Sequence, residues 1–333
     1  MVQDTEQLVA ALEREVTGLI GRYDYADQTT VRLLSESENK VYLIDDPVSG
    51  EKDVARVSSG RLSYHEPGQV DSEMRWLMHL HDNTDIVVPK VRPARDGTLV
   101  HTLSSDDLDK PRQAVIYSFI SGSEPPEDDL IPGFERLGTI SAQMHKEAKA
   151  WRAPDSFYRP SLTPESMLDD QLNWGPWQNG IHVEGDVLDL LTRVDQTLRK
   201  RLAALSTDRD RFGLIHADLR LANLLVEGDR TAIIDFDDLG YGWFLYDLAT
   251  ALSFLEERAD VPDLVASWLD GYRRIANVPA DLEAAIPTLI MLRRLQLLGW
   301  VGYQYHRIDF AREIGPTFTN DTCTLAEIYL SDH

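Results

Sequence analysis

The period of apolar positions separates a strand-rich first part of the chain from a helical second part. Residues 4–20 repeat apolar side chains at helical spacing, which predicts an amphipathic helix. Three short alternating runs follow, TTVRLL, KVYLID and DVARVS, with polar turns between them. Because successive side chains of a strand point to opposite faces, this alternation predicts antiparallel strands joined as hairpins.

A second helix is predicted over residues 69–82. Its shared face consists of Val70, Glu73, Met74, Leu77 and Leu80. Further strand signals are IVVPKVRPAR, GTLVHTL and AVIYSFI, and helical periods then cover 134–151, 186–205, 245–258, 262–276 and 281–305. This order predicts an α+β, bilobal fold. Residues 1–120 would form a small antiparallel-sheet lobe with one main helix, and residues 121–333 a larger, mostly helical lobe.

One segment, residues 214–236, interrupts the helical part with two apolar runs. The runs NLLV and TAII are separated by EGDR, which predicts a hairpin with a four-residue loop. If Val226 lies opposite Thr231, then Asn223 lies opposite Ile234. Asn223 and Asp235 would therefore lie side by side at the open end of the hairpin, and neither would be buried within a strand.

The polar residues of this segment predict a metal site and a base. An amide oxygen and a carboxylate suit Mg²⁺, which takes few protein ligands, so Asn223 and Asp235 are the expected ligands. Asp218, in the preceding loop, can accept a proton from a hydroxyl nucleophile, a contribution of ~10²–10⁴ in rate. His216 is expected to order that loop through hydrogen bonds. Asp218, His216 and Asn223 are thus the candidate catalytic residues.

The spacing of these residues matches a known motif. HADLRLAN, followed by DF twelve residues beyond its Asn, fits the catalytic-loop and metal-loop pattern of protein kinases. The alternative is a structural hairpin with incidental polar ends. The chain resembles the aminoglycoside phosphotransferase and choline kinase group of small-molecule kinases, most strongly from Leu214 to Ala251. The resemblance implies a protein-kinase-like fold with ATP and Mg²⁺ as cofactors. It also implies that Asp218 is the catalytic base and that Asp247 braces the catalytic loop.

A charge pair in the first lobe supports the same interpretation. Glu73 lies on an otherwise apolar helical stripe, where an unpaired charge is costly. The candidate partner is Arg56 on the strand DVARVS, and the two resemble the kinase pair that positions ATP phosphates. Kinases usually carry Lys there, and Arg resembles the choline-kinase-like branch. The alternative is that Arg56 is solvated and Glu73 lies at the edge of the stripe.

Other nucleotide contacts are expected near the strands. The first hairpin turn, SESEN, contains no glycine, so the glycine-rich phosphate loop of kinases is missing. Backbone N–H groups of residues 35–39 are still expected to face phosphates, with Ser37 and Asn39 as candidates. The segment IYSFISG should provide backbone contacts to adenine, at Ser118, Phe119 and Ile120.

The distance between two motifs indicates the kind of acceptor. Asp235 and Asp247 are twelve residues apart, too close for the long activation segment of a protein kinase, and A-P-E is absent. A small hydroxylated acceptor is therefore expected. Carboxylates with aromatic rings suit an amine. The candidate lining residues are Asp237, Asp238, Tyr241, Trp243, Trp174, Trp177, Trp300 and Tyr303. The alternative places the aromatic rings in the core and pairs the carboxylates with Arg220.

Composition narrows the class of partner. The 333-residue chain has a formal net charge of −23, which disfavours nucleic acid and suits an amine-bearing ligand or simply keeps the surface soluble. The single cysteine, Cys323, excludes an intrachain disulfide and favours a reducing compartment, so a cytoplasmic location is expected. The first residues do not read as a signal peptide, and no apolar run would span a bilayer, so no membrane partner is expected.

Together these observations predict an ATP- and Mg²⁺-dependent phosphotransferase that acts on a hydroxyl of a small, amine-bearing molecule. Two acceptor types remain open: an aminoglycoside-type antibiotic, or an amino-alcohol metabolite such as choline or homoserine. Two rival functions are a catalytically silent nucleotide-binding protein on the same fold and an atypical protein Ser/Thr kinase. The sequence does not determine the oligomeric state.

Overall fold

The computed structural model describes residues 5–36, 39–60, 66–125, 130–169, 174–228 and 230–332. The chain forms two compact units, each assembled from separate stretches. The first unit comprises Met1–Ser123, Ala153–Arg159 and Leu225–Asp237, and the second comprises Glu124–Arg152, Pro160–Leu224 and Asp238–His333. The two units cannot be separated at one position in the sequence, because the short segments Ala153–Arg159 and Leu225–Asp237 belong to the first unit. The lobe boundary after residue 120 stays a prediction.

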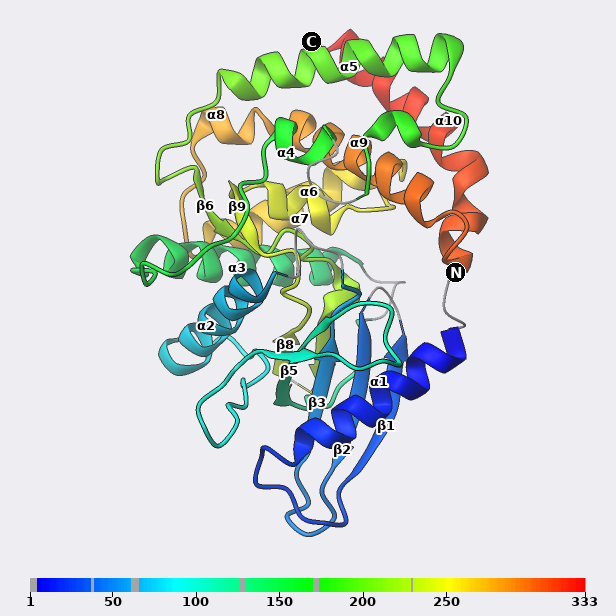
Figure 1. The fold of residues 1–333 in the computed structure, drawn as a ribbon. Helices are drawn as coiled ribbons and strands as arrows, with labels where there is room; N and C mark the ends of the chain where they lie inside the picture. Colours follow the sequence, from blue (N-terminus) through cyan, green and yellow to red (C-terminus); the bar gives the residue numbers. More distant parts are fainter. Residues whose placement is uncertain are drawn as a thin grey trace. The chain divides into compact units, whose positions relative to one another are not determined.

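The first unit is built on a five-stranded antiparallel sheet with the order β1-β2-β3-β5-β4. The strands are β1 (Thr30–Glu36), β2 (Lys40–Asp45), β3 (Lys52–Val57), β4 (His101–Leu103) and β5 (Arg112–Ser118). Helix α1 (Thr5–Ile20) lies across one face of this sheet (Figure 1), where Leu12, Val16 and Leu19 pack into its core. The predicted amphipathic helix and the first three strands are therefore confirmed.

Helix α2 (Pro67–Asn83) confirms the second predicted helix and buries the predicted face, including Glu73. The strand predicted over residues 86–95 is wrong. Only isolated bridges form there, from Val87 to Ala232 and from Val91 to Tyr117. The segment contains two prolines, which lack the N–H group that a strand ladder requires.

The predicted hairpin exists, with a tighter turn than expected. Strands β7 (Leu224–Glu227) and β8 (Arg230–Ile233) form a two-stranded sheet and leave residues 228 and 229 between them. The predicted four-residue loop is wrong, since its outer residues belong to the strands. Gly228 has φ of 59°, a left-handed conformation that glycine adopts without steric cost.

The second unit is mostly helical. Its longer helices are α3 (Leu130–Ala150), α5 (Gly185–Ala203), α7 (Val261–Arg273), α9 (Ile286–Gln304) and α10 (Asp309–Ser331). Its short helices are α4 (Pro164–Leu168), η1 (Trp177–Asn179), η2 (Leu221–Asn223), α6 (Tyr246–Ala251) and α8 (Ala280–Glu283). Strands β6 (Phe212–Ile215) and β9 (Gly240–Trp243) pair antiparallel within this unit. Helix α9 is buried along most of its length, so polar side chains on it must find partners inside the protein.

Two predicted helices differ from the structure, and one long helix was not predicted. The helix predicted over 245–258 ends at Ala251, and Phe254 has φ of 67°, which no α-helix can include. The helix predicted over 281–305 is divided into α8 and α9, with Pro287 in the first turn of α9. Helix α10 was not predicted, and Pro316 inside it weakens its helical signal. In the described ranges, no helix combines the length and apolarity that crossing a membrane requires.

Candidate active site

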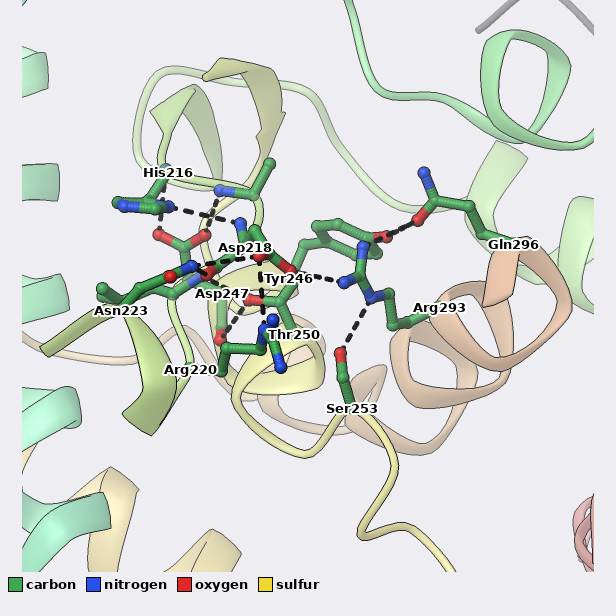
Figure 2. Close-up of polar contacts among 12 residues, drawn as sticks. His216, Asp218, Arg220, Asn223, Tyr246, Asp247, Thr250, Ser253, Arg293 and Gln296 are labelled. Atoms are coloured by element: carbon green, nitrogen blue, oxygen red, sulfur yellow. Dashed lines mark hydrogen bonds and ion pairs between the residues drawn. The ribbon is translucent and has the colours of Figure 1, made fainter. Parts of the chain in front are cut away.

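The loop between β6 and η2 is fixed by a buried carboxylate. Asp247 is fully buried at the start of α6. Its Oδ1 accepts the backbone N–H of Ala217 at 2.8 Å, and its Oδ2 accepts the N–H of His216 at 3.2 Å (Figure 2). From the other side, His145 Nε2 lies 2.9 Å from the same Oδ2. These bonds satisfy two buried N–H groups and hold the loop in one conformation.

Asp218, at the tip of this loop, has partners on both carboxylate oxygens (Figure 2). Its Oδ1 accepts a hydrogen bond from Arg293 Nη2 at 2.6 Å, and its Oδ2 accepts one from Asn223 Nδ2 at 3.0 Å. Arg220 Nε lies 3.4 Å from Oδ2. The Asp218 side chain keeps 16% of its surface exposed, so a small molecule can reach it. The result is an oriented, accessible carboxylate.

Asn223 ends η2 beside Asp218. Its Nδ2 donates to the Asp218 backbone oxygen at 2.8 Å as well as to the carboxylate. Because both contacts use the amide nitrogen, Oδ1 is the atom that Asn223 can offer to a cation. Asp218 and Asn223 therefore lie in direct contact within the second unit.

Arg293 is a member of this cluster that the sequence analysis missed. It comes from the middle of α9, 75 residues beyond Asp218. Its Nε donates to Ser253 Oγ at 2.9 Å, and its Nη1 donates to Gln296 Oε1 at 3.1 Å. Burial acts to lower the pKa of Arg293. The nearby Tyr246 and the carboxylates outweigh burial, and the pKa lies above its ordinary value. The only sequence signal was a pair of arginines within an apolar helix.

His216 is buried within the loop and does not face the solvent. Its Nδ1 accepts the backbone N–H of Asp218 at 3.3 Å. This contact agrees with a role in ordering the loop, and a direct catalytic role for His216 stays a prediction.

The predicted charge pair of the first unit is present. Arg56 Nη1 and Nη2 donate to the two carboxylate oxygens of Glu73 at 2.7 and 2.6 Å, and both side chains are buried. Arg56 Nη1 also lies 3.4 Å from Asp237 Oδ1. Burial acts to lower the pKa of Arg56, but Glu73, Tyr117 and Asp237 raise it well above its ordinary value. A cation fixed by two carboxylates is a rigid element of this unit.

Asp237 lies in a different group of residues from the one expected. It was predicted to line the acceptor pocket, but its carboxylate lies beside Arg56 in the first unit. Asn39 Nδ2 donates to Asp237 Oδ2 at 2.9 Å, while Asn39 Oδ1 accepts the N–H of Ser59 at 3.2 Å. Asn39 therefore ties the first hairpin to Asp237. Ser37, the other candidate of that hairpin, lies outside the described residues.

The predicted adenine contacts have other backbone partners. The N–H of Ser118 donates to Lys90 O at 2.8 Å, and the N–H of Phe119 donates to Lys52 O at 3.0 Å. Ser118 and Phe119 could therefore contact a base only through their carbonyl groups. A backbone N–H donor to the base would have to come from Ile120. All three line a cavity of about 350 Å³ in the first unit. Their role in binding adenine stays a prediction.

Three of the predicted acceptor residues, Trp174, Trp177 and Trp243, are buried in the core, which corrects the expectation for them. Trp177 is fully buried and donates from Nε1 to Asp195 Oδ2 at 3.2 Å. Trp243 is buried in β9 and donates from Nε1 to Ser206 O at 3.2 Å. Their rings pack inside the second unit because a large aromatic surface gains more from burial than from exposure.

The remaining acceptor candidates stay predictions. Tyr241 and Tyr303 are half-buried, and Arg307 lies over the Tyr303 ring at 4.1 Å from its centroid. Burial raises the pKa of Tyr246, and the charges of Asp238 and Asp218 add to this rise; the same two carboxylates, after Tyr246, raise the pKa of Arg293.

The predicted metal ligands come from the two units. Asn223 belongs to the second unit, and Asp235 to the first, where it has φ of 64°. Both offer oxygen atoms, which fits a hard cation such as Mg²⁺. Among the described residues, no three His, Cys, Asp or Glu side chains gather as a metal site. The pairing of Asn223 with Asp235 around a cation stays a prediction.

The comparisons with known proteins determine the family. Residues 29–285 match the model of the phosphotransferase enzyme family. The chain belongs to this family. The resemblance stated from HADLRLAN and the residues after it is therefore confirmed, as is the expectation of a phosphotransferase.

Three known proteins are similar to this chain over most of its length. The solved structure of a microcompartment-associated aminopropanol kinase is 39% identical, with a TM-score of 0.86 over 97% of this chain and 98% of that one. The amicoumacin kinase of Bacillus subtilis is 24% identical over 86% of this chain and 84% of its own length. A second amicoumacin kinase, solved in complex with AMP-PNP, Ca²⁺ and Ami, is 20% identical, with a TM-score of 0.77 over 96% of both chains. These likenesses confirm the α+β, protein-kinase-like fold class.

Proposed function

We propose that this phosphotransferase is an ATP-dependent kinase that phosphorylates the hydroxyl of a small amino alcohol, with Mg²⁺ as the cation. The observation that carries the proposal is the geometry of Asp218, a carboxylate held by Arg293 and Asn223 yet partly open to solvent. A carboxylate so oriented is suited to receive the proton of an acceptor hydroxyl.

The position of Asp218 determines how the γ-phosphoryl group would be transferred. The acceptor O–H donates to Asp218, and its oxygen forms a bond to the γ-phosphorus of ATP as the proton passes to the carboxylate. The bond from the γ-phosphorus to the bridging oxygen breaks, and ADP leaves with the electron pair. Asp218 then returns the proton to solvent. Because such transition states are loose, orientation by Asp218 contributes more than base strength.

The polyphosphate of ATP would be bound by other residues, namely Asn223, Asp235 and Arg56. Mg²⁺, when bound, neutralises phosphate charge, and Asn223 Oδ1 with the Asp235 carboxylate would hold it. Arg56 has five N–H donors, of which Glu73 uses two. The remaining donors can face phosphate oxygens while the two carboxylates keep the guanidinium in place.

An amino alcohol is favoured over an antibiotic for two reasons. The aminopropanol kinase has a higher sequence identity to this chain than either amicoumacin kinase, and a higher TM-score than the amicoumacin kinase whose structure is solved. In addition, the charge of Asp238 acts on Arg293 and Tyr246, as the charge of Asp218 does, and two such carboxylates suit a substrate that carries an ammonium group. A protein acceptor is disfavoured, because the segment from Asp235 to Asp247 is too short to form a peptide-binding shelf.

The test is a panel of acceptors assayed for ADP release and for an acceptor mass gain of one phosphoryl group. The panel contains aminopropanol, ethanolamine, choline, homoserine, an aminoglycoside, amicoumacin and a generic protein, each with ATP or GTP and with Mg²⁺ or EDTA. We expect phosphorylation of an amino alcohol with ATP and Mg²⁺, and its loss in Asp218→Asn. Phosphorylation of the antibiotics alone, or turnover unchanged in Asp218→Asn, would contradict the proposal.

A further inference from the structure

Arg293 makes three directional hydrogen bonds inside the second unit, and one of them reaches the candidate base. Each nitrogen of the guanidinium has a different acceptor: Ser253 Oγ, Gln296 Oε1 and Asp218 Oδ1 (Figure 2). The contact to Asp218 is the shortest, at 2.6 Å, and only 5% of the Arg293 side chain is exposed. A charge-assisted bond of this length in a buried setting is strong and directional.

We propose that Arg293 is a positioning residue for phosphoryl transfer. By binding Oδ1 of Asp218, it fixes the rotation of the carboxylate and leaves Oδ2, which also accepts a hydrogen bond from Asn223, as the oxygen that can receive the acceptor hydroxyl. This inference rests on the proposed function, in which Asp218 receives the hydroxyl proton. Arg293 would thus act together with the HADLRLAN motif, although it lies on α9, 75 residues beyond Asp218.

The guanidinium is itself held in place by its neighbours. Gln296, one turn along α9, accepts from Arg293 Nη1 and also from the Tyr246 hydroxyl, at 2.6 Å. Ser253 follows α6 and accepts from Nε. The planar fork of arginine can satisfy all three acceptors at once, whereas the ammonium of lysine is a single point on a shorter side chain. Position 293 therefore requires the shape of arginine as well as its charge.

The adjacent Arg294 provides a matched comparison within the same helix. It is fully buried and bonds Glu256 at 2.7 Å and Thr322 at 2.8 Å, and it lies over the Phe318 ring. Its partners are on α10 and on the turn after α6, and none of its contacts reaches Asp218. Arg294 is thus an equally buried arginine with a structural role. A loss common to both positions would reflect folding, and a loss confined to position 293 would reflect positioning.

The experiment compares Arg293→Met, Arg293→Lys, Ser253→Ala and Arg294→Met with wild type, using kcat and both KM values. We expect Arg293→Met to lower kcat by about 10²-fold, the scale of a misplaced reacting group, with the KM for ATP unchanged. Arg293→Lys and Ser253→Ala should lower kcat less, because each keeps part of the arrangement. Arg294→Met should lower thermal stability and leave the kcat of the folded fraction near wild type.

Guanidinium chloride at millimolar concentration supplies a second measurement, with sodium chloride and urea as controls. We expect guanidinium to raise the kcat of Arg293→Met and to leave that of Arg294→Met unchanged. The inference is overturned if folded Arg293→Met keeps the wild-type kcat, or if its loss equals that of Arg294→Met and guanidinium restores none of it. If Arg293→Met does not fold, an unchanged kcat in both Arg293→Lys and Ser253→Ala overturns it.

Failure of the proposed function would look different. In that case Asp218→Asn keeps turnover, or no amino alcohol is phosphorylated by the wild type. Loss of turnover in Asp218→Asn together with normal turnover in Arg293→Met would remove the role of Arg293 alone.

Discussion

Ala217 has a left-handed backbone, with φ of 68°, and its N–H donates to Asp247 Oδ1 at 2.8 Å. A residue with a β-carbon rarely adopts this conformation, which costs of order 1–3 kcal/mol. The buried carboxylate offsets that cost and determines the path of the loop that carries Asp218.

The strain at position 217 gives the first prediction. Ala217→Gly removes the steric cost of a positive φ and keeps the N–H, so we expect the free energy of unfolding to rise by about 1 kcal/mol. Asp247→Ala leaves the buried N–H groups of His216 and Ala217 without their acceptor. This substitution should lower the free energy of unfolding by about 1–3 kcal/mol per group. Urea denaturation measures both changes. A destabilised Ala217→Gly variant would show that the loop is not strained.

The Arg56–Glu73 pair gives the second prediction. Glu73→Ala would leave a buried guanidinium without its main partner, so we expect a loss of about 3–5 kcal/mol in the free energy of unfolding. The exposed pair between Arg92 and Glu51, at 3.4 Å, is a matched control, and Glu51→Ala should change stability by at most about 0.5 kcal/mol. Urea denaturation measures the free energy of unfolding of both variants. Equal effects would mean that the buried pair contributes no more than a surface pair.

His101 gives a prediction about pH. Its Nδ1 lies 3.1 Å from Arg22 Nη1 and its Nε2 lies 2.8 Å from the Tyr23 hydroxyl. Arginine can only donate, so Nδ1 is an acceptor and the ring is neutral. Burial, followed by the charge of Arg22, lowers the pKa of His101 below its ordinary value.

The sign of the pH effect follows from that shift. The folded state resists protonation of His101, while the unfolded state takes up a proton near pH 6.5. The stability contribution is therefore complete above about pH 6.5 and is lost as the pH falls below it. We expect the Tm to fall between pH 7.5 and pH 5.5, and to fall less in His101→Phe, as scanning calorimetry can measure. An equal fall in both proteins would assign the effect to other groups.

Asp237 gives the fourth prediction, which tests whether its side chain acts on ATP binding or on acceptor binding. Because its carboxylate contacts Arg56 and Asn39, Asp237→Asn should raise the KM for ATP several-fold and leave the KM for the acceptor unchanged. Steady-state kinetics with each substrate varied in turn measures both constants. A change confined to the acceptor KM would restore Asp237 to the acceptor pocket.

Much of the first unit could be predicted from the sequence, because its signals are local. The alternation in β1 to β3 and the stripe on α2 act over a few residues, and each was found where the pattern placed it. The pairing of Arg56 with Glu73 was also predictable, since a carboxylate on a buried stripe requires a nearby cation. The closeness of Asp218 and Asn223 follows from their spacing of five residues in one loop.

Tertiary packing decided the rest. The pairing of Arg293 with Asp218, the burial of Trp177 and Trp243, and the contact of Asp237 with Arg56 each depend on segments far apart in the chain. The sequence by itself determined the catalytic loop motif and the elements whose periods are regular. The three-dimensional structure alone determined which aromatic rings are enclosed and which distant charges, such as Arg293 and Asp218, meet. The reason is that an apolar or charged residue has the same local pattern whether its partner is protein or solvent.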